Sequence, residues 1–403
     1  MNTNSKRKAI IVGGSLGGLF AATTLRAIGW DVEVFERSPS ELYSRGGGLV
    51  LQPDVVNAFH FAGIQHPSPL GVRSGDRIFL DEGDHVIHRQ YMPQTQTSWQ
   101  MLYGILKRAV PAELVHAGEQ FVGFEQRPDG VEVRFASGRT AFGDLMIGAD
   151  GARSSVREHL LPKVTPRYAG YVAWRGLVEE PDLTARIDEV LGQTFAWQRG
   201  RDHLLLEYLV PGLDGSIKPG SRRRNWVWYR AVREGQELQR VLTDRDGVRH
   251  TFSLPPGTPD EAVFAEMRDA AGRLLAPTFQ HLVAATREPF LQAILDLQVP
   301  QMVFGRALLL GDAAFVPRPH TAGGAAKAAA NAVALAQALR DSPHSIELAL
   351  RRWEASQIEE GRSMCEWGIS IGDELMGIEA IANDADGPSA PHCKSNVGVA
   401  NDR

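Results

Sequence analysis

The sequence predicts an α/β protein that combines a domain of parallel strands and helices with an antiparallel sheet and C-terminal helices. Two apolar runs, at residues 9–12 and 307–310, each end at a glycine and precede a helical segment, which is typical of strands in a parallel sheet. Between them, residues 166–290 contain aromatic-rich segments that run apolar or alternate, as antiparallel strands do. With 403 residues the chain exceeds one ordinary core, so two closely packed domains are expected.

The N-terminal strand leads into the glycine-rich turn VGGSLGG and a helix predicted over residues 19–28. The glycines allow the tight turn, and the N-terminus of the helix is suited to a pyrophosphate group. Ser15 stands where the GxGxxG pattern has its middle glycine, which weakens the motif without excluding the site. The contacts predicted for this turn are Gly13, Ser15, Leu16 and Gly18.

A second apolar strand, over residues 31–35, ends at Glu36. A carboxylate about 20 residues beyond the glycine turn accepts the ribose hydroxyls in dinucleotide sites. Arg37 follows it and belongs to the predicted site. Strand, helix and acidic residue together predict a Rossmann-like dinucleotide-binding domain.

Two further segments of the first half carry candidate contacts. Residues 45–53 read RGGGLVLQP, and glycines there permit close passage of the backbone beside a cofactor. A flexible loop is the alternative interpretation of this segment. A meander of short strands over residues 120–142 then leads to the segment GADGARSSVR. The alternative for that segment is an Asp-Gly turn followed by a capped helix.

The late motif follows the second apolar run. A glycine and an aspartate come directly after the strand, and a helix is predicted over residues 325–339. The N-terminus of that helix would stabilise a negative charge. The segment therefore has the composition of a second glycine turn that leads into a helix.

In this order, the segments IIVGGSLGG, GADG and GRALLLGDAA resemble the fingerprint of the class A FAD-dependent aromatic hydroxylases, the para-hydroxybenzoate hydroxylase family, over residues 8–365. The resemblance implies an FAD-binding domain of that family's type, NADH or NADPH as co-substrate, and O2. It also implies ring hydroxylation through a flavin hydroperoxide, with Asp312 at the ribityl chain of FAD and the N-terminus of the helix over residues 325–339 at the pyrimidine side of the flavin. The further FAD contacts that the resemblance implies are Arg45, Gly48, Asp150, Gly311, Gly323, Gly324 and Ala325. Phe315 stands where the family usually has His, and Asn331 where it usually has Asp.

The substrate is indicated by YAGYVAWRG at residues 168–176 and VPRPHTAGGAAK at residues 316–327. Both resemble the members of the family that hydroxylate dihydroxypyridines, which implies a small hydroxylated N-heteroaromatic substrate. A urate-like or hydroxybenzoate substrate stays open. So does an NAD(P)H- and FAD-dependent oxidoreductase that does not hydroxylate.

Catalysis requires groups that position the ring and withdraw the proton from its hydroxyl. His320 is the first candidate, because His titrates near neutral pH and the resemblance puts it beside the flavin. A role in holding the substrate is equally open for it. In the strand predicted over residues 225–230, Asn225 is expected to share a face with Tyr229. The other candidate residues are Arg175, Tyr208, Tyr229 and His203.

Composition and cysteine content exclude several other classes. The net charge of -5 arises from 43 basic and 48 acidic side chains without a basic block, so no nucleic-acid partner is expected. No apolar run reaches membrane-spanning length, and no membrane partner is expected. Cys365 and Cys393 form no CxxC pair, which argues against a flavin disulfide reductase and favours a reducing cytoplasm. No metal site is predicted, and a homodimer stays open.

An NAD-dependent dehydrogenase and a flavin-free binding protein of the same fold remain rival classes. A purified protein with the yellow colour of flavin would exclude both. The predicted organisation is an FAD-binding domain over residues 1–165 and 290–382, a substrate-binding sheet domain over residues 166–289, and a flexible tail over residues 383–403.

Overall fold

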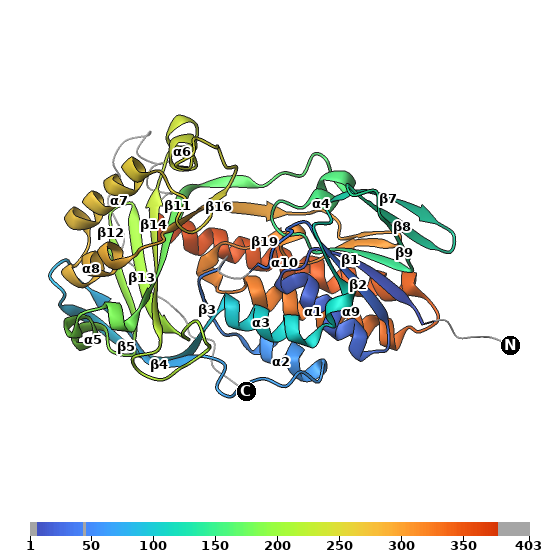
Figure 1. Cartoon of the computed structure of the whole chain (residues 1–403), viewed down its shortest axis with the longest axis horizontal. Coiled ribbons are helices and arrows are strands. Elements are labelled where there is room, and N and C mark those ends of the chain that lie inside the picture. The colour runs from blue at the N-terminus through green and yellow to red at the C-terminus, as the bar shows by residue number, and fades with distance from the viewer. Residues whose placement is uncertain (1–5, 43–45, 378–403) are drawn as a thin grey trace.

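The computed structural model describes residues 6–42 and 46–377. Figure 1 shows two large sheets toward opposite ends of the molecule, with the long C-terminal helix α10 (Ile346–Met376) packed against strands of both. This mixed α/β architecture with C-terminal helices confirms the predicted fold class. Arg45 and the predicted tail lie outside the described residues.

The first sheet carries the glycine motifs. In the described part of the chain its strand order is β17-β18-β10-β1-β2-β6, parallel throughout except for the pair β17·β18. Strand β1 (Lys8–Val12), near the centre of this sheet, is buried on both faces, as expected for an apolar strand of a parallel sheet. The bounds are β1 (Lys8–Val12), β2 (Asp31–Glu36), β6 (Val115–Ala117), β10 (Leu145–Gly148), β17 (Val303–Phe304) and β18 (Ala307–Leu309).

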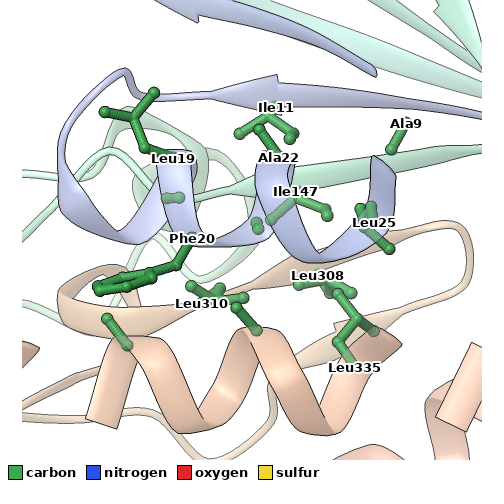
Figure 2. Packing of buried hydrophobic residues seen from close by; sticks show 14 of the residues in the cluster. Ala9, Ile11, Leu19, Phe20, Ala22, Leu25, Ile147, Leu308, Leu310 and Leu335 are labelled. Carbon is green, nitrogen blue, oxygen red and sulfur yellow. The ribbon is translucent and has the colours of Figure 1, made fainter. Parts of the chain in front are cut away.

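Two helices that follow glycine motifs pack against each other beside this sheet. Figure 2 shows α1 (Leu16–Ala27) between the strands and α9 (Gly324–Asp341), with Phe20 and Leu25 directed toward the side of Leu335. Alanines on both helices allow a close approach, and the hydroxyl of Thr24 donates to the carbonyl oxygen of Ala332 at 3.2 Å. The two glycine motifs are thereby fixed relative to each other.

The predicted meander is present as an antiparallel sheet of β7 (Phe121–Arg127), β8 (Gly130–Phe135) and β9 (Thr140–Gly143). It leads directly into β10 of the parallel sheet, as the sequence predicts.

The larger sheet has the order β15-β16-β11-β14-β13-β12-β4-β5-β3 among the described residues, with β19 paired to β16. All of its pairs are antiparallel except β12·β4. The bounds are β3 (Gly48–Val50), β4 (Val72–Leu80), β5 (Val86–Ser98), β11 (Arg167–Glu179), β12 (Phe195–Gly200), β13 (His203–Val210), β14 (Arg223–Ala231), β15 (Ser253–Leu254), β16 (Phe290–Gln298) and β19 (Phe315–Val316).

The two faces of the larger sheet have different neighbours. Trp226 and Trp228 belong to the core formed with α7 (Glu261–Leu274) and α8 (Pro277–Ala285). Tyr229 belongs to the cluster on the other face, which includes Met376 of α10. The face alternation predicted for this strand is therefore confirmed. The second face, which carries Tyr229, is called the inner face below.

Strands from the first half of the chain join the larger sheet, which the sequence analysis did not foresee. β3, β4 and β5 lie within residues 46–98, yet they continue the sheet built by residues 167–298. Most of β5 is exposed on both sides, so its residues lack the apolar alternation that predicts a strand. The sheet boundary therefore differs from position 165, and the division into two domains at that position stays a prediction.

The remaining helices are short, and in the described residues none has the length and apolar character needed to cross a membrane. Their bounds are α2 (Pro53–Phe61), α3 (Trp99–Ala109), α4 (Ser155–Leu160), α5 (Ala185–Leu191), α6 (Gln236–Val241), η1 (Ala112–Leu114), η2 (Glu180–Asp182), η3 (Gly311–Ala313) and η4 (Pro319–Thr321).

Candidate active site

The three motifs meet at the carboxyl edge of the parallel sheet. Gly13 follows β1, Ala149 follows β10 and Leu310 follows β18, and these strands are neighbours. A Cβ atom on Gly13 would lie 2.4 Å from the carbonyl oxygen of Ala149, and one on Gly17 would lie 3.7 Å from Leu310. Ligands of open α/β sheets bind at this edge.

The first motif is built around two positions that tolerate only glycine. Gly13 has a φ of +113°, and a Cβ atom on Gly18 would lie 1.8 Å from the carbonyl oxygen of Gly13. Ser15 precedes α1 without forming a side-chain cap, and Leu16 is buried at the start of the helix. The predicted register of the turn therefore agrees with the steric demands of the structure, while contact with a cofactor stays a prediction.

Two helix N-termini at this edge lack protein caps. Neither Ser15 before α1 nor Gly323 before α9 caps its helix with a side chain, and neither first turn holds an acidic residue. Gly324 has open space where a side chain would stand, and Ala325 lies beside it in the first turn. The free N–H groups of such turns suit phosphate or another anion.

Glu36 is held in position at the end of β2. One carboxylate oxygen accepts from the backbone N–H of Gly14 at 2.8 Å, and the other accepts from that of Ser38 at 2.9 Å. The side chain is half-buried, whereas Arg37 is exposed. These bonds orient the carboxylate at the glycine turn and leave its remaining lone pairs available for ribose hydroxyls.

Asp150 caps the helix that follows it. Its carboxylate accepts from the hydroxyl of Ser154 at 2.5 Å and from the backbone N–H of Ser155 at 2.7 Å. Burial raises the pKa of Asp150 above its usual value. Arg157, on α4, is buried and donates to the carbonyl oxygens of Ala152 and Ala313. This arginine therefore joins the second motif to the third within the protein.

The third motif is fixed by α9. Gly311 has a φ of +67° and donates its N–H to the side-chain oxygen of Asn331 at 3.1 Å. Asn331 in turn donates to Gln357 of α10 at 2.6 Å. Asp312 remains half-exposed and pairs with the buried ammonium group of Lys327 at 2.9 Å. Asn331, one of the two departures from the family pattern, thus anchors the turn.

The glycines of residues 46–48 pack against protein side chains. A Cβ atom on Gly46 would lie 2.5 Å from Trp99, and one on Gly48 would lie 2.5 Å from Tyr208. The N–H of Gly48 donates to the side-chain oxygen of Asn225 at 2.7 Å. These glycines therefore give the backbone a close approach to the inner face of the larger sheet, and their contact with a cofactor stays a prediction.

Three predicted substrate residues come together on the inner face of the larger sheet. Tyr208 and Tyr229 are buried in one cluster, and burial raises the pKa of each phenol. The positive charge of Arg175 acts on both phenols in the opposite direction, so this guanidinium lies close to them. Both tyrosines therefore stay protonated at neutral pH.

His203 lies on the opposite face. Its Nδ1 atom accepts a hydrogen bond from the indole N–H of Trp228 at 3.2 Å, and the two rings meet edge to face. Since Trp228 belongs to the core beneath α7 and α8, the structure does not bring His203 together with Tyr208 and Tyr229. Burial lowers the pKa of this His, which packs as a core residue.

His320 lies in η4, in the loop before α9, and its ring lies against Tyr171 and Tyr229 on the inner face of the larger sheet. Its Nε2 atom lies 2.9 Å from the hydroxyl oxygen of Tyr171, and its ring centroid lies 4.5 Å from that of Tyr229. Burial, with Arg318 and Arg175 as further causes, lowers the pKa of His320 to about 4. The imidazole is therefore neutral at physiological pH.

Three buried nitrogen atoms around this space have no hydrogen-bonding partner among the described residues. They are Nε of Arg175, Nδ2 of Asn225 and Nδ1 of His320. A buried polar atom without a partner is costly, so such atoms mark places where a ligand or water supplies the bond. Arg175 and Asn225 are donors, and the site is therefore suited to a ligand rich in acceptor oxygens.

Sequence reasoning missed Tyr171, Arg318 and Lys327. Tyr171 could have been found, because strand alternation puts it on the same face as Arg175. Arg318 pairs with Asp296 and Asp373, and Lys327 pairs with Asp312 on η3. These partners are distant in sequence, so no local sequence pattern predicts the pairs.

Comparisons with known proteins agree with this geometry. A family model described as FAD binding domain-like matches residues 168–296. The chain is 35% identical to the 2,6-dihydroxypyridine 3-monooxygenase of Paenarthrobacter nicotinovorans over 88% of this chain and 87% of that protein. The solved 2,6-dihydroxypyridine-3-hydroxylase from Arthrobacter nicotinovorans superposes with a TM-score of 0.86 at 32% identity, covering 92% of this chain and 93% of the other.

A more distant structure, Klebsiella pneumoniae HpxO complexed with FAD and uric acid, has a TM-score of 0.76 at 23% identity and supports the fold alone. It covers 94% of this chain and 91% of that chain. Uncapped helix ends, an oriented Glu36 and an open Asp312 are features that fit FAD. Given this fit and a relative of 35% identity over most of both chains, the protein belongs to the class A FAD-dependent aromatic hydroxylases, monooxygenases that use NAD(P)H and O2.

Proposed function

We propose that this enzyme hydroxylates an electron-rich, hydroxylated N-heteroaromatic ring of the dihydroxypyridine type. The observation that carries the proposal is the inner face of the larger sheet, where Tyr208 and Tyr229 accompany unpartnered donors on Arg175 and Asn225. Aromatic walls suit a flat ring, and the donors suit its oxygen substituents. The resemblance to 2,6-dihydroxypyridine 3-monooxygenase supports the same class of substrate.

FAD would be held along the carboxyl edge of the parallel sheet. In this proposal the N-terminus of α1 faces the pyrophosphate, Glu36 accepts the ribose hydroxyls and Asp312 accepts hydroxyls of the ribityl chain. The N-terminus of α9, at Gly323 and Gly324, stabilises negative charge on the pyrimidine side of the ring system. When bound, FAD supplies the redox chemistry that activates O2 with electrons from NADH or NADPH.

The protein's own groups orient the substrate ring and exclude water from it. Arg175, with its charge close to both phenols, is suited to hold an oxygen of the ring that carries negative charge. Tyr208 and Tyr229 keep their protons and donate or accept neutral hydrogen bonds. Positioning of this kind contributes to rate because the reacting atoms are held in a productive geometry.

A substrate panel tests the function. Dihydroxypyridines, hydroxynicotinate, hydroxybenzoates and urate would each be scored for substrate-stimulated NADH and NADPH oxidation, with the product mass measured after reaction under 18O2. We expect incorporation of one labelled oxygen atom into a hydroxylated pyridine. Coupled oxygenation of urate or a hydroxybenzoate alone would favour the alternative substrate, and NAD(P)H oxidation without an oxygenated product would favour an oxidoreductase that does not hydroxylate.

Arg175→Gln provides a site-specific test in the same assay. We expect the Michaelis constant for the ring substrate to rise about tenfold or more, because a charged hydrogen bond is lost. Arg199→Gln serves as the matched control, since Arg199 belongs to the same sheet but its side chain is exposed and donates to a carbonyl oxygen of α10. An unchanged Michaelis constant in Arg175→Gln would place the substrate elsewhere.

We also propose a homodimer located in the cytoplasm. Exposed apolar side chains on β5 support the dimer, because Ile87 is 68% exposed and Tyr91 is 73% exposed. One edge of β5 pairs with β4 along these residues, whereas β3 pairs with the other edge only at residues 96–98. The free thiol of buried Cys365 and the use of NAD(P)H support a reducing compartment. Light scattering of the wild type and of Ile87→Lys tests the dimer, and fractionation of the native host tests the location.

A further inference from the structure

A buried ionic cluster lies behind His320. The guanidinium of Arg318 is held by the carboxylate of Asp296 on β16, with contacts of 2.7 and 2.8 Å, and by that of Asp373 on α10 at 2.7 Å. Arg318 is only 4% exposed. Burial of the guanidinium is therefore compensated by two acids from two separate elements, which fixes the position of Arg318 in the loop before α9.

The guanidinium of Arg318 lies beside the phenol of Tyr171. Its central carbon is 5.6 Å from the ring centroid, and a Cβ atom on Gly372 of α10 would meet both the Tyr171 hydroxyl oxygen and Nη1 of Arg318. A cation at this position repels the hydroxyl hydrogen and attracts the oxygen lone pairs, so the hydrogen of Tyr171 points away from Arg318. The partner of the hydroxyl is Nε2 of His320, at 2.9 Å, and no further acceptor for the Tyr171 hydroxyl is present among the described residues. With its hydrogen directed away from Arg318, the Tyr171 hydroxyl donates to Nε2 of His320.

If Nε2 accepts, a neutral imidazole carries its hydrogen on Nδ1. That atom is buried and has no partner within the described chain. The groups facing the ring are Tyr171 and Arg175 from β11, Tyr229 from β14 and Arg318 from its own loop, with Asp296 and Asp373 behind them. The positive neighbours oppose a positive charge on the imidazole.

We propose that Arg318, held by Asp296 and Asp373, acts through Tyr171 to fix His320 as the tautomer with hydrogen on Nδ1, so that His320 donates a hydrogen bond to the substrate. Arg318 and Tyr171 are positioning residues in this scheme. Together with Arg175 and Asn225, His320 completes a set of donors that receives the ring as an oxyanion. The proton of the ring hydroxyl then leaves to solvent when the anion binds, and His320 does not take it up. The inference rests on the proposed function only for the identity of the ligand, and not for the tautomer of His320.

The tautomer can be measured without substrate. In holoenzyme labelled with 15N at histidine, the resonances of His320 are assigned by their loss in His320→Asn. We expect a protonated Nδ1 and an accepting Nε2 that do not titrate between pH 6 and 9, a range that brackets ordinary histidine near 6.5. Tyr171→Phe and Arg318→Lys are expected to mix the tautomers. Tyr168→Phe is the control, because Tyr168 lies on β11 like Tyr171 but its hydroxyl donates to the carbonyl oxygen of Val232, and this variant should leave the tautomer unchanged.

Two amide replacements separate donation from proton removal. The amide nitrogen of Asn can stand where Nδ1 stands, so His320→Asn should keep the Michaelis constant for 2,6-dihydroxypyridine within about threefold of wild type. His320→Gln lacks a donor there and should raise it about tenfold, the cost of one hydrogen bond to a charged group. Neither variant should lose an acidic limb of the pH-rate profile.

Two results would overturn the inference. The first is an imidazole of His320 that carries its hydrogen on Nε2, or is charged, in the substrate-free holoenzyme. The second is an equal loss of turnover in both amide variants with an unchanged Michaelis constant, because that is the behaviour expected when a catalytic base is removed. Absence of turnover with every hydroxylated pyridine in the wild type would instead overturn the proposed function. The NMR measurement would still decide the role of Arg318 and Tyr171 in that case.

Discussion

The ammonium group of Lys327 lies 2.9 Å from the carboxylate of Asp312, across the gap between α9 and η3. Lys327 is buried, whereas half of the Asp312 side chain is exposed. The lysine also donates to the carbonyl oxygen of Phe315, so it is held from two sides. An acid that is expected to face the cofactor is therefore oriented by a buried cation, and its half-exposed carboxylate remains open to a ligand.

Removal of either predicted FAD-facing acid should release flavin from a folded protein. We expect Asp312→Ala and Glu36→Ala each to weaken FAD binding by about 1.5–3 kcal/mol, the cost of a charged hydrogen bond. Fluorescence titration of the apoprotein with FAD measures the effect, and circular dichroism verifies the fold. Asp341→Ala, at the exposed end of the same helix as Lys327, is the control. Unchanged affinity in both variants would refute the assignment.

Branched side chains in the first motif should block FAD more severely than a change at Ser15. Gly18→Val would press against the carbonyl oxygen of Gly13, and Gly13→Val adds an unfavourable positive φ. Ser15→Gly removes a side chain that forms no cap. The flavin content of the purified proteins is the measurement, with Gly272→Val on α7, where space is open, as the control. Equal loss in all three motif variants would mean that the register is wrong.

The pH dependence of stability should carry the signature of His320. Its folded-state pKa of about 4 lies below the ordinary value of 6.5, so between these values the unfolded chain binds a proton that the folded protein does not. The free energy of unfolding should therefore fall as pH decreases from 6.5 to 4, by at most roughly 3 kcal/mol from this group. Urea unfolding of wild type and His320→Gln across that range isolates the contribution. Parallel curves would contradict the depressed pKa.

The buried ion pair between Arg224 and Glu207 in the larger sheet should contribute strongly to stability. Arg224 and Glu207 are both fully buried and lie 2.9 Å apart. Arg224→Met leaves the carboxyl group of Glu207 without its cation, which should cost about 3–5 kcal/mol in the free energy of unfolding. Arg240→Met removes an exposed partner of Glu266 and should change stability by less than about 1 kcal/mol. A similar loss in both variants would show that burial does not govern these pairs.

The parts of the fold that sequence could predict are those with local patterns. The strands before Gly13 and Gly311 are continuous apolar runs, and strand alternation correctly puts Asn225 and Tyr229 on one face. The sequence analysis did not predict β5, because both faces of this strand are exposed over residues 86–93 and apolar residues therefore do not alternate along it. Period alone cannot reveal a strand of that kind.

The candidate site was predictable to the same extent. His320 and Arg175 stand in segments with a recognisable resemblance, and both are found at the inner face of the larger sheet. The partners of Arg318 are 22 and 55 residues away in sequence, so only the folded chain brings them together. His203 was indistinguishable from a site residue because one position in a strand decides which face a side chain occupies.

The parallel pairing of β4 with β12 has a consequence for recombination among relatives. Phe195 stands opposite Arg77 in this pair, so a segment from the first quarter of the chain completes the sheet of the middle. A chimera that exchanged only residues 166–289 would pair β4 of one protein with β12 of the other, and would place each strand among packing contacts from a different sequence. Crossovers that move residues 46–98 together with residues 167–298 would keep these strands together, because the sheet that we propose to bind the substrate is encoded by two separate stretches of the sequence.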